Sequence, residues 1–291
     1  MAITVWTGAA DGDWGVAGNW SNGVPVNGDT VYLRDNAVDI DAGLNQAAVT
    51  IAQLVKDKSY TGRVGTDAAY LQIGATLVDI GAHYGQGDPV GSDRFKLDLT
   101  SADTTVTVHD TCASSAEENL PPVRLLVANV VAGSIVRVLK GTVGIGIEDP
   151  SEASELNLVV GYKSSQSSDA VVVCGEGVTV SDLYAYGGKT TVRGTLTTVE
   201  LYDGEVTAAG AANITTATIN DGTFYPDEPA VITTLHCYGG TTDLTRSAKP
   251  RTVTSSDYKP GSTIKFDPDV VTFTNPLTAL DPVQLTVSEG V

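Results

Sequence analysis

Hydrophobic and polar residues alternate strictly in four short segments between residues 178 and 261. Alternation with a period of two is typical of a β-strand that buries one of its two faces. The apolar positions of the four segments are Leu183 and Ala185, Val199 and Leu201, Ala217 and Ile219, and Leu235 and Cys237. The polar positions between them are Tyr184, Glu200, Thr218 and His236. The pattern therefore predicts four strands that direct their apolar side chains into one core.

Each of these segments ends in a short turn that contains glycine. The turns read Tyr186-Gly187-Gly188, Tyr202-Asp203-Gly204, Asn220-Asp221-Gly222 and Tyr238-Gly239-Gly240, and a looser copy ends at Gly261. Their last glycines recur at nearly even intervals, and a repeat in this range is typical of repeat proteins. We expect glycine at the end of such a turn because it adopts a positive φ without steric strain.

The same turns are also compatible with antiparallel hairpins, in which Asp-Gly is common. A ladder of hairpins, however, does not return equivalent residues to the same side at every turn. Here the residue before the turn is Tyr186, Tyr202, Asn220 and then Tyr238, as expected when one coil stacks on the next. The sequence therefore predicts an all-β fold, a right-handed parallel β-helix (β-solenoid) with coils of about 18 residues.

Residues 1–30 differ from the rest of the chain because they contain all three tryptophans, Trp6, Trp14 and Trp20. The first coil of a solenoid exposes an apolar end and unpaired backbone amides, which large aromatic side chains can cover. We therefore interpret this segment as an N-terminal cap. The alternative is an exposed docking patch, in which the three tryptophans form an interface with a partner.

The remaining chain is divided into a solenoid and a tail. The solenoid is expected over residues 31–268, with irregular loops at 81–93 and 109–121 that are rich in Gly, Asp, Ser or Pro. Residues 269–291 are predicted to form a C-terminal tail. This tail either adds an exchange or docking strand or frays.

The chain is strongly acidic. It carries 35 acidic and 17 basic side chains, a net charge of −18. Such a surface repels phosphate backbones and anionic lipids, so we expect neither nucleic-acid nor membrane binding, and we expect a partner with a basic patch. The opening residues contain no basic leader with an apolar run of signal length, which predicts synthesis in a cytoplasm without a signal peptide.

Residues with catalytic or metal-binding chemistry are scattered. Asp203 and Asp221 occupy equivalent turn positions in consecutive coils and could act as a pair of catalytic carboxylates, but the turn itself favours Asp for backbone reasons. The cysteines (Cys112, Cys174, Cys237) and histidines (His83, His109, His236) show no metal-ligand spacing. We interpret Cys237 as a core residue. The sequence predicts no catalytic residue, no metal site and no cofactor.

Several short motifs resemble those of known β-helical proteins. The opening string Trp6-Thr-Gly, Asp13-Trp, Asn19-Trp-Ser-Asn-Gly-Val-Pro25 and Gly28-Asp-Thr-Val is similar to the start of β-helical repeats in autotransporter-type passengers and in phage-encoded virion proteins. Tyr70-Leu-Gln-Ile-Gly-Ala75, Lys96-Leu-Asp-Leu99 and Val138-Leu-Lys-Gly-Thr-Val143 look more like the phage group. The resemblance covers scattered pieces between residues 30 and 270.

The resemblance implies a non-enzymatic structural protein of the virion. We expect a capsid decoration protein that binds the major capsid protein and forms a homo-oligomer, a trimer by analogy with the family. Two alternatives stay open. One is a tailspike or fibre protein that binds or cleaves host surface polysaccharide, which would make the chain an enzyme that acts on polysaccharide. The other is a secreted β-helical adhesin.

Overall fold

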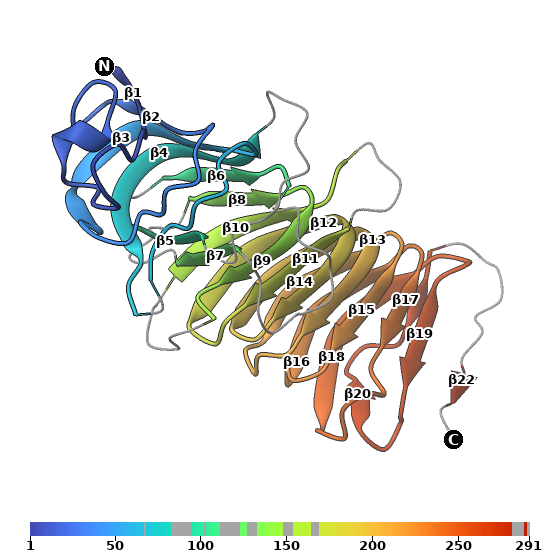
Figure 1. Ribbon diagram of the computed structural model, residues 1–291. Coiled ribbons are helices and arrows are strands. Elements are labelled where there is room, and N and C mark those ends of the chain that lie inside the picture. The colour runs from blue at the N-terminus through green and yellow to red at the C-terminus, as the bar shows by residue number, and fades with distance from the viewer. Residues whose placement is uncertain are drawn as a thin grey trace.

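The computed structural model describes residues 1–66, 68–82, 95–101, 103–110, 123–126, 133–147, 154–163, 169–280 and 288–289. In this part of the chain the strands form one 22-stranded sheet that winds into a rod, with the two termini at opposite ends (Figure 1). The only helix among these residues is one 3-10 turn, Ala17–Asn19. The predicted parallel β-solenoid is therefore confirmed.

The longest side of the rod is one column of parallel strands. In spatial order they are β1 (Ile3–Val5), β2 (Thr30–Leu33), β3 (Asn45–Asp57), β4 (Leu71–Ala82), β6 (Thr105–Val108), β8 (Ile135–Val138), β10 (Ser154–Val160), β12 (Val178–Val192), β13 (Thr195–Ala208), β14 (Ile214–Ile219), β16 (Val231–Cys237), β18 (Arg251–Tyr258) and β21 (Thr278–Ala279). Residues one coil apart pair directly, for example Leu201 with Ile219 and Ile219 with Cys237.

A second parallel column closes the coil. It contains parts of β3, β4, β12 and β13, which bend around a corner of the rod, together with β5 (Phe95–Leu99), β7 (Val123–Leu126), β9 (Gly141–Ile145), β11 (Ala170–Cys174), β15 (Thr223–Pro226), β17 (Thr241–Asp243), β19 (Thr263–Phe266) and β22 (Ser288–Glu289). A third side includes the pairing of β18 with β20 (Val271–Phe273).

The core is a narrow column of aliphatic side chains that runs through the coils. All eight apolar positions expected to point inward in the regular coils are at most 1% exposed. They are Leu183, Ala185, Val199, Leu201, Ala217, Ile219, Leu235 and Cys237. Burial of each Val, Leu or Ile side chain contributes about 1.5–3 kcal/mol, so the fold needs few aromatic residues outside the cap. Cys174 and Cys237 are buried free thiols, and burial raises the pKa of each to about 12.

One corner of the rod is lined by the glycines that end the predicted turns. Gly188, Gly204, Gly222 and Gly240 all have positive φ, between 60° and 86°. They also lie directly over one another: a Cβ atom on Gly204 would come within 2.3 Å of the Gly188 carbonyl oxygen, and one on Gly222 within 2.5 Å of that of Gly204. Glycine is required here both by the backbone conformation and by the close approach of consecutive coils.

The three tryptophans form the predicted cap at the N-terminal end. Trp20 packs edge-on against Trp6 and Trp14, with ring centroids 5.0 and 4.6 Å apart. The side chains of Trp6, Trp14 and Trp20 are only 1%, 0% and 5% exposed. The Trp20 indole N–H donates to the Trp14 carbonyl oxygen at 2.7 Å, and that of Trp6 to the Val38 carbonyl oxygen at 3.1 Å. These buried rings join the apolar core and present almost no surface to a partner.

The same segment also contains the first strand of the solenoid. β1 pairs in parallel with β2, so the strand column begins within residues 1–30. Its outer edge is covered, because the Ser21 hydroxyl accepts the Val5 N–H at 3.0 Å and the Ser21 N–H donates to the Val5 carbonyl oxygen. The Asn22 amide donates to the Ile3 carbonyl oxygen at 2.7 Å. These contacts satisfy an edge on which another chain would otherwise pair.

Parts of the expected loops and tail lie outside the described residues. They are residues 83–94, with His83, residues 111–122, with Cys112, and residues 281–287 and 290–291 of the tail. Within the tail, β20 and β21 continue the parallel pairing of β18.

Candidate functional site

The exposed corner beside the glycine column carries the tyrosines that precede the turns. Tyr186 and Tyr202 occupy the same position in consecutive coils, and their rings stack with centroids 4.8 Å apart and an interplanar angle of 19°. This distance matches the spacing of neighbouring strands, about 4.8 Å. The two tyrosines follow the paired residues Ala185 and Leu201, after which the register shifts so that Tyr186 pairs with Asp203. Both rings lie on the outside of the rod.

A carboxylate beside this stack lowers the acidity of the Tyr202 hydroxyl group. The Tyr202 hydroxyl donates to the Glu200 carboxylate at 2.5 Å, and this bond, with the negative charge of Glu200, raises the pKa of Tyr202 to about 12. The pKa of Tyr184 is also raised, first by partial burial and then by the charges of Asp182 and Glu200. The corner therefore combines aromatic rings with hydrogen-bond acceptors.

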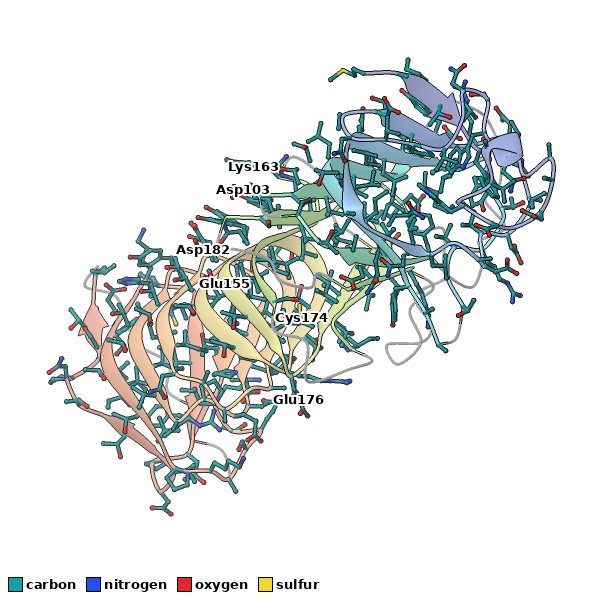
Figure 2. The ribbon with its side chains drawn as sticks, turned by 90° about the vertical axis from the view of Figure 1, so that its left-hand side faces the viewer. Asp103, Glu155, Lys163, Cys174, Glu176 and Asp182 are labelled. Atoms are coloured by element: carbon teal, nitrogen blue, oxygen red, sulfur yellow. The ribbon has the colours of Figure 1, made fainter. Side chains whose placement is uncertain are left out.

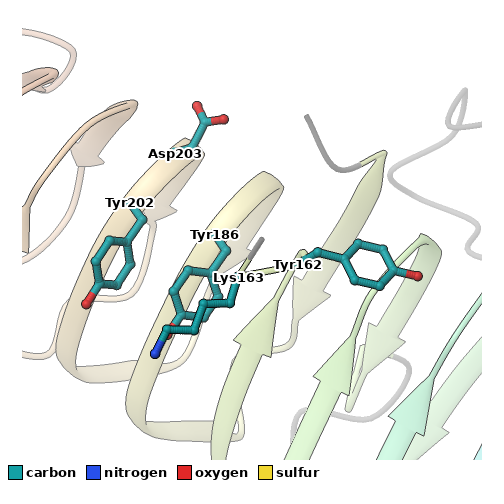
Figure 3. Close-up of a pocket in the computed structure, with 5 residues that line it drawn as sticks. All are labelled: Tyr162, Lys163, Tyr186, Tyr202 and Asp203. Atoms are coloured by element: carbon teal, nitrogen blue, oxygen red, sulfur yellow. The ribbon is translucent and has the colours of Figure 1, made fainter. Parts of the chain in front are cut away.

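A hollow of about 270 Å³ opens beside the stack (Figure 3). We call it the tyrosine hollow; it is lined by Tyr162, Lys163, Tyr186, Tyr202 and Asp203. Tyr162 and Lys163 follow β10, whereas the other lining residues come from β12 and β13. The side-chain view shows Lys163 and Asp182 at one edge of the rod and Glu176 at the opposite edge (Figure 2).

The two turn aspartates that the sequence analysis considered as a catalytic pair each accept a hydrogen bond from the backbone of their own turn. One carboxylate oxygen of Asp203 accepts the N–H of Gly204 at 2.7 Å, and Asp221 accepts the N–H of Gly222 at the same distance. Both contacts stabilise the positive-φ glycine that follows. This geometry matches the backbone role that the turn sequence favours.

A contact between a histidine and an aspartate, which the sequence pattern does not indicate, lies farther along the same face. His236 Nδ1 is 2.8 Å from Asp257 Oδ1, and the His236 ring stacks on Tyr238 with centroids 5.6 Å apart. The Lys259 ammonium lies 4.5 Å from the centre of the Tyr238 ring. These residues are brought together because β16 pairs with β18 in the next coil. This coil is longer than the regular ones before it, which hides the contact in the sequence.

The remaining predicted ladder residues lie where the repeat places them. Asn220 follows Tyr202 in the column, with its N–H donating to the Leu201 carbonyl oxygen, and Tyr238 follows with its N–H donating to that of Ile219. Gly188, Gly204, Gly222 and Gly240 form the adjacent glycine column. The hollow was not predicted, because Tyr162 and Lys163 belong to a longer coil outside the regular repeats.

No family model, curated protein or solved structure matches this chain. What the site can bind therefore follows from its own geometry. Among the residues that the structure describes, no three His, Cys, Asp or Glu side chains converge as metal ligands do. In the same residues no helix has the length and apolar character needed to cross a membrane.

Proposed function

We propose that the chain is a non-enzymatic structural protein of a phage particle, namely a decoration protein that binds the major capsid shell. The observation that supports this function most directly is the continuous solenoid. Its strands pair in parallel from β1 to β21, and the aliphatic core extends through the same coils. A rod built in this way resists bending, because every coil is hydrogen-bonded to its neighbours.

The charge of the chain supports the same proposal. A net charge of −18 attracts a basic surface and keeps neighbouring copies from associating nonspecifically. A decoration protein needs both properties, since many copies occupy one shell. Homo-oligomerisation, with a trimer as the state implied by the resemblance, is part of the proposal, as is a location on the virion after synthesis in the host cytoplasm.

The test is binding to capsids of the phage that encodes the chain. Purified protein is mixed with capsids assembled from the major capsid protein of the same genome, and bound protein is measured by co-sedimentation and located by cryo-electron microscopy. We expect saturable binding at symmetry-related positions that weakens as the salt concentration rises, because screening reduces attraction between opposite charges. Absence of co-sedimentation at low salt would contradict the proposal.

The two alternative functions make different predictions. A tailspike that cleaves host polysaccharide would release reducing ends from that polysaccharide, and a secreted adhesin would be encoded behind an upstream signal sequence. Genes for a portal, a terminase or a major capsid protein beside this one favour the decoration protein over the adhesin.

A further inference from the structure

The tyrosine hollow exists because one coil lacks a side chain at the stacking position. Val160 pairs with Ala185, so Gly161 follows at the place that Tyr186 occupies one coil later. Gly161 has a φ of 80° and the chain then leaves the column through Tyr162 and Lys163. Within the part of the chain that the structure describes, the face of the Tyr186 ring that is turned away from Tyr202 therefore has no equivalent ring stacked on it.

Other tyrosines on this rod are covered by cations of the chain itself. Arg34 lies 5.1 Å from the ring centre of Tyr32, Arg246 4.0 Å from that of Tyr225, and Lys259 4.5 Å from that of Tyr238. Tyr186 instead stacks on Tyr202 on one side and borders the hollow on the other. The stack thus presents an aromatic platform that is held by two paired strands, β12 and β13.

The polar groups around this platform are mixed in charge. Lys163 contributes an ammonium group and Asp203 a carboxylate, while Tyr162, which is 40% exposed, contributes a phenol. Figure 3 shows Lys163 extending toward the hydroxyl end of Tyr186, whereas the Asp203 carboxylate points the other way. Donors and acceptors are therefore available at opposite edges of the platform.

We propose that the tyrosine hollow binds one pyranose ring of a neutral glycan, stacked on Tyr186. The C–H face of a sugar ring is apolar and packs on an aromatic ring, whose face carries partial negative charge. The hydroxyl groups at the edge of the sugar both donate and accept, so they can bind Lys163 and the phenols. At about 270 Å³ the hollow is slightly smaller than typical drug-sized sites of about 300–1,000 Å³, which fits a single sugar ring.

The charges of the lining disfavour the other ligands that use aromatic platforms. A Lys or Arg side chain of a protein partner also stacks on tyrosine and is attracted by Asp203 and Glu200, but in the hollow it would lie beside the Lys163 ammonium, which repels it. An acidic sugar would bind Lys163 but meets Asp203, Glu200 and a strongly negative chain. A neutral sugar ring with several hydroxyl groups is repelled neither by Lys163 nor by the carboxylates.

The experiment measures binding of neutral sugars to the full chain. The methyl pyranosides of glucose, galactose, mannose and N-acetylglucosamine, and their oligosaccharides, are titrated and followed by saturation-transfer NMR and calorimetry. We expect saturable binding of at least one of them, with a Kd on the order of 1 mM for a single ring. Tyr186→Ala should weaken this binding about tenfold or more, whereas Tyr186→Phe should retain most of it because the ring is preserved.

Two further variants distinguish a loss of the binding site from a loss of folding. Lys163→Ala changes an exposed lining residue outside the strands and should weaken binding several-fold. Tyr238→Ala removes a tyrosine of the same column outside the hollow and should leave binding unchanged. Absence of saturable binding to every sugar of the panel would overturn the proposal, as would equal binding by the wild type and Tyr186→Ala. Saturable binding of an Arg-rich peptide with no sugar binding would assign the hollow to a protein partner instead.

The outcome is separable from the capsid-binding proposal. If Tyr186→Ala abolishes sugar binding but the variant still co-sediments with capsids, both proposals are supported. A wild-type chain that binds the sugar but does not co-sediment with capsids retains the hollow as a glycan site and removes the decoration function.

Discussion

The N-terminal cap and the regular coils between β12 and β18 bury their apolar side chains by different kinds of contact. In the regular coils a residue packs on its equivalent one coil away, as Val199 does on Ala217. In the cap, by contrast, each contact is specific to its place and is not repeated in a neighbouring coil. The buried Asn19 amide, for example, donates to the Asp11 carboxylate at 2.7 Å and to the Asp13 carbonyl oxygen at 2.9 Å.

This difference determines how each region should respond to substitution. A regular coil has a neighbour on both sides, so a substitution there disturbs two interfaces and interrupts the rod in its middle. The cap has one neighbour, so its loss should unfold the end of the rod and leave distant coils folded.

The largest effect is expected for Trp14→Ala in the cap. Trp14 is fully buried against Trp20, and truncation of a buried Trp costs about 3–5 kcal/mol. Hydrogen exchange should show lost protection in β1 and β2, with unchanged protection in β13 to β16. Trp14→Phe keeps most of the buried volume and should lose much less. Equal loss of protection along the whole rod would show that the cap and the coils unfold as one unit.

Gly204→Ala is expected to destabilise the regular coils by about 3 kcal/mol. A left-handed conformation costs a residue with a Cβ about 1–2 kcal/mol, and the new Cβ would also overlap the Gly188 carbonyl oxygen at 2.3 Å. Gly261→Ala is the matched control, because Gly261 has a similar φ of 92° but no atom of the described residues within 4 Å of the place where a Cβ would lie. It should cost only the conformational part, measured as a smaller shift in the denaturation midpoint. Equal losses in the two variants would contradict a role for close stacking.

A pH-dependent effect of intermediate size is expected at Asp29 in the cap. Its carboxylate accepts the N–H groups of Ala2 at 2.7 Å and Val26 at 3.1 Å, and these bonds hold the pKa of Asp29 below its ordinary value of 3.8. The ionised form is favoured by folding, so its contribution is complete above pH 3.8 and is lost as the pH falls through the lower pKa of the folded state.

Asp29→Asn tests this contribution. The amide keeps one acceptor oxygen but no charge, so the cap should lose about 1–2 kcal/mol at neutral pH and should show a weaker dependence on acid than the wild type. The measurement is hydrogen exchange of β1 and β2 as a function of pH. An unchanged acid dependence in the variant would assign the acid sensitivity of the cap to other carboxylates.

The regular coils could be predicted from the sequence because their length is nearly constant. Leu183 pairs with Val199, and Val199 with Ala217, across nearly equal intervals of the chain. Between β4 and β8 the register is equally regular. However, the stretches of chain from Val78 to Val106 and from Val106 to Val136 are each more than one and a half times as long as those in the regular coils. Much of the extra chain lies outside the described residues, and the inward positions Val78, Val106 and Val136 still pair with one another. A search for a fixed period therefore misses these coils although they share one core.

The candidate site was predictable only in part, for the same reason. Tyr186 and Tyr202 each precede the turn of a regular coil, which the sequence shows, and their rings stack although a register shift pairs Tyr186 with Asp203. Tyr162 and Lys163 reach the hollow from a coil that extends away from the column after Gly161, and nothing in their local sequence indicates it. The pairing of His236 with Asp257 likewise depends on a coil that is longer than the regular repeat.

The smallest expected effect is a gain in stability from Asn220→Tyr. Asn220 occupies the column between Tyr202 and Tyr238, and its buried amide nitrogen has no hydrogen-bond partner among the described residues. A tyrosine at this place would stack on Tyr202 as Tyr186 does and remove the unpartnered amide, which should raise the free energy of unfolding by about 0.5–1 kcal/mol in denaturant titrations. Asn220→Ala separates the two contributions, since it removes the amide without adding a ring. If Asn220→Tyr is no more stable than Asn220→Ala, ring stacking along this column adds nothing to the stability that the backbone register already provides, and the regular coils owe their order to the core and the glycines alone.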